Sequence, residues 1–233
     1  MSAQEVILQL KSFATVERKN KNEYYFKTGP GQYSEFDQFI GVRTPQIRLI
    51  AKQHYQCIAF NEIDKLINHA VHEIRYCGLI ILVYQYQSGN QGVFNYYLKN
   101  IHAVNNWDLV DYSTPHIIGD YLFKHQDKRS LLYDWAKSNS LWERRIAIVA
   151  TFSFIKQGEF SPTLEIGKLL LNDKADLIHK ALGWMLREIY KKDAKTCEAF
   201  LRENYAQLPR TTLRYAIERM QEDKRQRYLK GVF

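Results

Sequence analysis

A repeat of about 35 residues is the feature that most restricts how this chain can fold. Basic residues stand just ahead of apolar helical segments at positions 75, 145, 180 and 214, which lie 70, 35 and 34 residues apart. The same period requires a further member at position 110 or 111, where Asp111 ends the segment Trp107-Asp108-Leu109-Val110-Asp111. The register therefore holds at this point, but an acid replaces the base.

The period also indicates the fold class. Strand signals are scarce, whereas apolar residues recur at helical spacing along the whole chain, so we expect an all-α protein. A period of this length with two helices per unit is typical of an α-solenoid, in which matching positions line one continuous surface. Tetratricopeptide and ankyrin signatures are absent. We therefore predict one domain of HEAT-like two-helix repeats over residues 1–233, with a concave basic groove; coincidental spacing among ordinary helices is the alternative.

Proline and glycine indicate where elements begin and end. Thr44-Pro45, Thr114-Pro115 and Ser161-Pro162 each pair a capping-type residue with a proline, which predicts three helix starts. The stretch Lys27–Asp37 contains Gly29-Pro30-Gly31 and is expected to be the one conspicuous loop.

Composition excludes several classes of protein. A hydrophobic fraction of 45% is too high for a disordered chain. The longest nearly apolar run, Tyr76–Tyr84, is too short to span a membrane, and Met1–Leu10 lacks the pattern of a secretion signal. The three cysteines are far apart, and the histidines show no paired metal spacing. We expect a cytoplasmic, nucleoid-associated monomer without metal or other cofactor.

The charge balance suits a polyanionic partner. The formal net charge is +8 and the isoelectric point is near 9.2. Towards the end of the chain, seven basic residues are opposed by only three acidic ones, namely Glu218, Glu222 and Asp223. This segment either contacts phosphates or is a solvated helical face.

Three segments carry side chains suited to chemistry or binding. Trp107 and Asp111 are four residues apart and share a helical face, although Asp111 alone would also fit a helix end or a salt bridge. The repeat register places Arg145, beside Arg144, on the concave side. Lys180, Trp184 and Arg187 share another face, where Gly183 would allow a close approach to the backbone; a lone tryptophan such as Trp184 is more commonly a core residue.

Taken together, these segments resemble the AlkD-type DNA alkylation repair glycosylases, a HEAT-like repeat family. The resemblance runs from end to end and rests on the following motifs: Tyr24-Tyr25-Phe26-Lys27, Phe39-Ile40-Gly41-Val42-Arg43-Thr44-Pro45, Trp107-Asp108-Leu109-Val110-Asp111, Trp142-Glu143-Arg144-Arg145 and Lys180-Ala181-Leu182-Gly183-Trp184-Met185-Leu186-Arg187-Glu188. The set is specific, whereas no single motif would be.

The resemblance implies roles for individual residues. Asp111 matches the catalytic carboxylate, Trp107 and Trp184 match tryptophans that embrace the sugar of the lesion, and Tyr25 matches a position that faces the substrate. Arg145 matches an arginine that holds a phosphate. Further basic residues expected to bind phosphate, from the resemblance or from the repeat register, are Arg48, Lys180, Arg187 and Arg214. Some family members carry a second tryptophan where Asn106 stands, which puts that part of the contact surface in doubt.

The implied activity agrees with the chemistry of these residues. A purine alkylated at N3 or N7 is positively charged, so it leaves as a neutral base and needs no general acid. A carboxylate can stabilise the cationic sugar that remains and orient a water molecule. We therefore expect hydrolysis of N3- and N7-alkylated purines in duplex DNA without a base-flipping pocket. The alternatives are a non-catalytic DNA-binding scaffold, against which the acid at position 111 argues, and a protein-binding scaffold, against which the basic groove argues.

Overall fold

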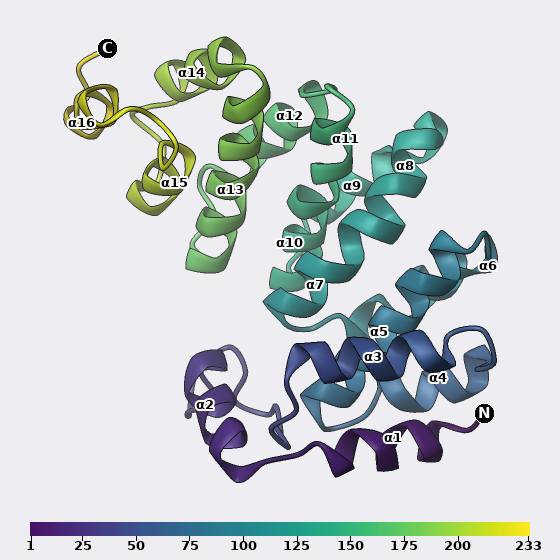
Figure 1. Ribbon diagram of the computed structural model, residues 1–233. Helices are drawn as coiled ribbons and strands as arrows, with labels where there is room; N and C mark the ends of the chain where they lie inside the picture. Colours follow the sequence, from purple (N-terminus) through teal and green to yellow (C-terminus); the bar gives the residue numbers. More distant parts are fainter. The chain divides into compact units, whose positions relative to one another are not determined.

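The computed structural model describes residues 1–233 and is all-α, as the periodicity predicted (Figure 1). The only β-type pairing is an isolated bridge between Gln38 and Val71. The chain divides into two compact units, Met1–Ile117 and Ile118–Phe233. Whether residues 1–233 behave as one domain stays a prediction.

The first unit contains seven α-helices and one 3₁₀ turn. They are α1 (Ala3–Ser12), α2 (Val16–Phe26), α3 (Thr44–His54), α4 (Phe60–Ile67), α5 (His72–Gln87), α6 (Gly92–Lys99), η1 (Ile101–Ala103) and α7 (Trp107–Thr114). The loop expected over Lys27–Asp37 is present and continues to Arg43, because α2 ends at Phe26 and α3 begins at Thr44.

The second unit follows a π-helical turn, η2 (Pro115–Gly119), within which the division between the units falls. Its elements are α8 (Asp120–Lys124), η3 (Gln126–Lys128), α9 (Ser130–Ala136), α10 (Leu141–Ala150), α11 (Phe152–Lys156), α12 (Ser161–Leu169), α13 (Asp176–Lys192), α14 (Ala194–Glu203), α15 (Arg210–Ala216) and α16 (Glu222–Lys230).

The two-helix repeat is confirmed in the positions of the helices. The second helices of successive pairs are α5, α7, α10, α13 and α15, which begin at residues 72, 107, 141, 176 and 210, so the intervals are 35, 34, 35 and 34 residues. Each residue that defined the repeat in the sequence is therefore the fourth or fifth residue of such a helix. The period arises because one helix pair and its connections recur as a unit.

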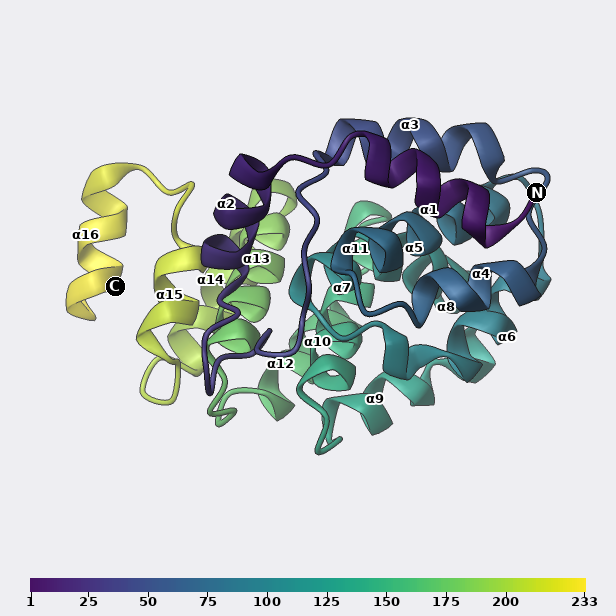
Figure 2. The ribbon, with the colours of Figure 1, turned by 90° about the horizontal axis from the view of Figure 1, so that it is seen from below.

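Each unit is organised around one long, largely buried helix. In the first unit, α5 packs against α3, α4, α6 and α7 (Figure 1). Most of its side chains are buried, as expected for a helix that is apolar on all sides. In the second unit, α13 packs against α10, α14 and α15 (Figure 2). This helix keeps one polar face. Both central helices thus occupy second positions in their repeats.

Two of the three predicted helix starts are confirmed. Helices begin at Thr44 and Ser161, although neither residue is the cap, and the preceding Arg43 and Phe160 make no side-chain capping hydrogen bond. The prediction at Thr114-Pro115 is wrong, because Thr114 ends α7. Pro115 lacks the N–H that an α-helix needs, and the chain passes it in the wider π-helical turn.

The expectation that all matching repeat positions line one open surface is wrong at Arg75 and at Arg145, because both side chains are buried. Arg75 donates hydrogen bonds to the carbonyl oxygens of His69 and Ala70 and to the carboxylate of Asp37. None of the helices is both long and apolar enough to cross a membrane. No group of three or more His, Cys, Asp or Glu side chains is placed to hold a metal ion.

Candidate active site

A cleft of about 370 Å³ lies within the first unit. Its walls come from α2, α3, α5, α7 and the loop between α2 and α3. Four residues singled out from the sequence line it together: Tyr25, Arg48, Trp107 and Asp111. Residues from three different helices thus meet in one concavity of a size typical of small ligand sites.

The first turns of α7 supply the tryptophan and the acid. Asn106 is the N-cap of this helix, and its side-chain oxygen accepts a hydrogen bond of 2.7 Å from the backbone N–H of Trp107. Asp111 follows one helical turn after Trp107, and both side chains are half-buried. The spacing of four residues therefore does place a ring and a carboxylate in the same cleft, as predicted.

A row of aromatic rings holds Trp107 in position. Phe26 stacks on Trp107 with ring centroids 5.4 Å apart and an interplanar angle of 17°. Tyr25 meets the same indole edge-on at 5.8 Å, although its own side chain is 64% exposed. On the other side Phe26 stacks on Phe39 at 5.0 Å. The cleft therefore offers aromatic faces supported from behind, which suits a ligand with a flat or cationic part.

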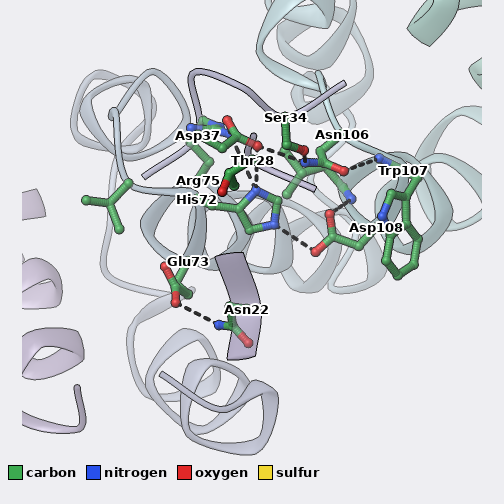
Figure 3. Close-up of polar contacts among 12 residues, drawn as sticks. Asn22, Thr28, Ser34, Asp37, His72, Glu73, Arg75, Asn106, Trp107 and Asp108 are labelled. Carbon is green, nitrogen blue, oxygen red and sulfur yellow. Dashed lines mark hydrogen bonds and ion pairs between the residues drawn. The ribbon is translucent and has the colours of Figure 1, made fainter. Parts of the chain in front are cut away.

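A buried cluster of charges connects α7 to α5 and to the loop between α2 and α3 (Figure 3). His72, which is 2% exposed, donates from Nε2 to Asp108 at 2.8 Å and from Nδ1 to Asp37 at 3.3 Å. Arg75 donates to the second oxygen of Asp37. Carboxylates only accept hydrogen bonds, so an imidazole between two of them carries a proton on each nitrogen.

The pKa values agree with a charged His72. Burial lowers its pKa, but the charge of Asp108 and the hydrogen bonds to Asp108 and Asp37 outweigh burial and raise the pKa to about 9. For Asp37, burial raises the pKa, but the His72 hydrogen bond and the Arg75 charge bring it down to about 2. The four charges of Asp37, His72, Asp108 and Arg75 balance, and each is hydrogen-bonded, as buried charges require.

Comparison with models of protein families identifies the family to which this chain belongs. The model of the DNA alkylation repair enzyme family matches residues 6–220, which is nearly the whole chain. This chain belongs to that family. No curated protein matches the chain significantly.

Solved structures agree on the fold of the family. A predicted DNA alkylation repair enzyme from Enterococcus faecalis is similar with a TM-score of 0.73 and 16% identity, over 90% of this chain and 97% of that one. AlkD2 from Streptococcus mutans gives a TM-score of 0.54 and 16% identity, over 93% and 97% of the two chains. The protein smu.31 from Streptococcus mutans UA159 gives 0.52 and 17%, over 94% and 98%.

Asn106, where some family members have a tryptophan, has a structural task in this chain. It is fully buried and donates from its amide nitrogen to Ser34 at 2.6 Å and to Asp37 at 2.8 Å (Figure 3). The residue ties the loop between α2 and α3 to the start of α7. A tryptophan is larger than this buried position allows, and it lacks the oxygen with which Asn106 caps α7. Position 106 therefore does not present a side chain at the surface of this structure.

Glu73 fixes the other side of the cleft. Its carboxylate accepts a hydrogen bond from Asn22 of α2 at 3.0 Å (Figure 3) and another from the backbone N–H of Gly41 at 2.8 Å. Gly41 has a positive φ of 85°, and a Cβ there would collide with the carbonyl oxygen of Thr15. The glycine in the predicted motif Phe39–Pro45 is thus required by its conformation and by the close approach of α2.

The other predicted site residues lie in the second unit. Arg145 is buried and donates to the carbonyl oxygen of Leu177. Lys180 pairs with Asp176 at 2.8 Å, and Arg187 pairs with Glu218. Two further residues of the prediction complete the set, namely Trp184, which is half-buried with its ring 5.5 Å from Phe152, and Arg214, which is exposed. Their roles toward DNA stay predictions.

Gly183 allows a close approach, as predicted, but another helix uses it. A Cβ at this position would lie 2.5 Å from the Cβ of Tyr215 and 2.6 Å from the carbonyl oxygen of Thr212. Both neighbours belong to α15, which packs on α13. The glycine in the family motif therefore serves helix packing between successive repeats.

Several residues of the cleft were missed in the sequence. His72, Phe26 and Arg18 all line it. Helical spacing could have found Arg18, because it lies seven residues before Tyr25 and so on the same face of α2. No local signal identifies His72, because its partners Asp37 and Asp108 are 35 and 36 residues away.

Proposed function

We propose that this protein is a DNA glycosylase that hydrolyses the N-glycosidic bond of cationic N3- and N7-alkylated purines in duplex DNA. The observation that carries the proposal is the presence of Asp111 in the same cleft as Trp107, Tyr25 and Arg48. Membership of the DNA alkylation repair enzyme family supports the choice of DNA as the substrate.

For this hydrolysis the protein needs mainly to place a negative charge and aromatic rings beside the sugar of the lesion. When the bond between the sugar carbon and the purine nitrogen breaks, the electron pair goes to the purine and cancels its positive charge. The sugar carbon becomes cationic, and Asp111 stabilises it and accepts a hydrogen bond from the attacking water. The water oxygen then bonds to the carbon, and its proton passes to Asp111 or to solvent. Trp107 and Tyr25 present ring faces that favour a cation by about 1 kcal/mol or more each.

The remaining predicted residues would hold the duplex. Arg48 in the first unit and Lys180, Arg187 and Arg214 in the second are proposed to bind phosphates as parts of a basic groove. Arg145 is covered in this structure, so its binding to a phosphate would require its guanidinium to leave the Leu177 carbonyl. Trp184 is proposed to contact the lesion strand. The protein is proposed to act as a cytoplasmic monomer, without a cofactor and without a base-flipping pocket.

Release of free bases from methylated duplex DNA tests the proposal. We expect 3-methyladenine and 7-methylguanine to be released by the protein, and uracil and hypoxanthine to stay in otherwise identical duplexes. Neutral bases need a proton donor or a tight pocket to leave, and the proposed site relies on the charge of the lesion instead. Binding to duplex DNA without any base release would point to the non-catalytic scaffold, and release of uracil would overturn the mechanism.

A further inference from the structure

Arg18 is a cleft residue whose side-chain Nε has no hydrogen-bond partner in the protein. The side chain is half-buried and lines the cleft, and its Nε is buried without a hydrogen-bond partner. Arg75 also has an unpartnered Nε, but its other nitrogens bind Asp37 and two backbone carbonyls, and it does not line the cleft. A buried donor without an acceptor costs about 1–3 kcal/mol, so Arg18 calls for an acceptor from outside the chain.

The position of Arg18 in its helix adds a second cost. Arg18 is in the first turn of α2, just after the N-cap Thr15, whose side chain accepts a hydrogen bond from the Arg18 backbone N–H. A positive side chain is unfavourable at a helix N-terminus, where the backbone already presents partial positive charge. The same turn also carries Glu17, and of its residues only Arg18 lines the cleft, so an anion in the cleft would meet the Arg18 side chain and not the helix end.

The cleft also has a polar organisation. Arg18 comes from α2 and Arg48 from α3, whereas the carboxylates of Asp108 and Asp111 come from α7. The carboxylate of Glu73 also lines the cleft, but it is buried and its oxygens already accept hydrogen bonds from Asn22 and from backbone N–H groups of the loop between α2 and α3. Arg48 lies over the ring of Tyr112, with its central carbon 5.2 Å from the ring centroid. A ligand that fits such a cleft carries an anionic group next to a cationic one. A phosphodiester beside a positively charged nucleoside has this pattern.

We infer that Arg18 and Arg48 form an anion subsite that binds one phosphate of the DNA backbone next to the modified nucleoside. The inference rests on the proposed function for the identity of the ligand. It assigns Arg18, which has no match in the family motifs, a role in placing the lesion strand so that the sugar faces Asp111.

Salt dependence of binding to undamaged duplex DNA is the first test. The variants are Arg18→Gln, Arg48→Gln and the double variant, with Lys19→Gln as the matched control. Lys19 is the next residue on α2, pairs with Glu23 at 3.7 Å and does not line the cleft. Each phosphate contact contributes about 0.9 to the slope of log affinity against log salt. We expect each single variant to lower the slope by about one, the double variant to lower it no further, and the control to leave it unchanged.

A second measurement locates the phosphate. In a duplex with a stable tetrahydrofuran abasic site, one phosphate at a time is replaced by an uncharged methylphosphonate. The unmodified protein should lose about tenfold in affinity at one phosphate beside the abasic site, and Arg18→Gln should be insensitive to that replacement. Circular dichroism and thermal unfolding of each variant verify that the fold is kept.

The outcomes separate this inference from the proposed function. If Arg18→Gln behaves like Lys19→Gln in both measurements, the subsite is wrong, even if the protein releases methylated purines. If the double variant lowers the slope by about two, the arginines bind separate phosphates and the shared subsite is wrong. If the phosphate sensitivity disappears as expected but no methylated purine is released, the subsite stands and the proposed hydrolysis fails.

Discussion

The charged groups around the predicted site residues differ between the two units. In the first unit, Asp37, His72, Asp108 and Arg75 form a buried cluster that fixes the start of α7 beside a cleft. In the second unit, Lys180 and Arg187 form ion pairs at least partly open to solvent, and Arg214 is exposed. Buried, fully bonded charges hold a geometry, whereas exposed pairs contribute little to stability and exchange partners easily.

This difference suggests a division of labour. The first unit has the acid, the supported aromatic rings and the cleft, so it is the part suited to chemistry. The second unit offers cations whose present partners, Asp176 and Glu218, a phosphate could replace. Substitutions in the two units should therefore have different effects. Substitutions in the first unit should change stability and base release. Substitutions in the second unit should change helix packing and the salt dependence of DNA binding.

The largest effect is expected from the titration of His72. Its pKa of about 9 is above the ordinary value of 6.5, so its contribution to stability is complete below pH 6.5 and is lost as the pH rises through about 9. The free energy of unfolding should fall by about 3 kcal/mol over this range, since each unit of pKa shift corresponds to about 1.4 kcal/mol.

Denaturant unfolding at a series of pH values measures this loss. His72→Gln should be less stable at pH 6.5 and should show a flatter profile between pH 6.5 and 9 than the unmodified protein. Burial lowers the pKa values of His54, which is buried, and His69, which is half-buried, so these two groups titrate below the range of pH 6.5 to 9. An equal slope in His72→Gln would show that the imidazolium does not stabilise the first unit.

The next largest effect is a loss of activity on substitution of Asp111. Asp111→Asn should reduce base release from methylated duplex DNA at least ~100-fold, because a positioned charge opposite the cationic sugar is lost. DNA affinity should change little. Asp127→Asn, at an exposed acid of the second unit, is the matched control and should keep full activity. Near-normal release by Asp111→Asn would make the acid structural and remove the proposed chemistry from the first unit.

A smaller effect is expected at Gly183 in the second unit. Gly183→Ala would force α13 and α15 apart, because the added carbon overlaps Thr212 and Tyr215. We expect a loss of about 1–3 kcal/mol in the free energy of unfolding, the usual cost of overpacking. Gly29→Ala, whose added carbon would meet only the flexible end of Gln32 at 3.2 Å, should cost much less. Equal stabilities for the two variants would contradict the packing role of Gly183.

The smallest effect is expected at Arg214. Arg214→Gln should lower the slope of log affinity against log salt by about one for undamaged duplex DNA and leave stability unchanged, since the side chain is exposed. Lys168→Gln is the control, because Lys168 is also exposed and pairs with Glu203. If Arg214→Gln keeps the slope of the unmodified protein, as Lys168→Gln is expected to do, Arg214 does not contact DNA.

Much of the fold was predictable from the sequence because the signals are local. Apolar spacing predicts helices, and the 35-residue register located Asp111 and is confirmed by the helix starts. The four-residue spacing within α7 correctly placed Trp107 and Asp111 on one helical face, where both line the cleft. Thr114-Pro115 was misread because a proline preceded by a threonine looks the same at a helix start and at a π-helical turn that follows a helix.

What the sequence determined by itself is therefore the repeat, the class of fold and the register of the acid and the aromatic side chains. These depend on residues within about one helical turn or one repeat of each other. Only the tertiary structure showed that Arg75 is buried, that His72 joins Asp37 to Asp108, and that the Nε of Arg18 has no hydrogen-bond partner beside the cleft. Burial and charge pairing depend on which distant segments of the chain pack together. The sequence alone therefore does not distinguish a basic residue that is buried against carboxylates from one that is exposed at the surface.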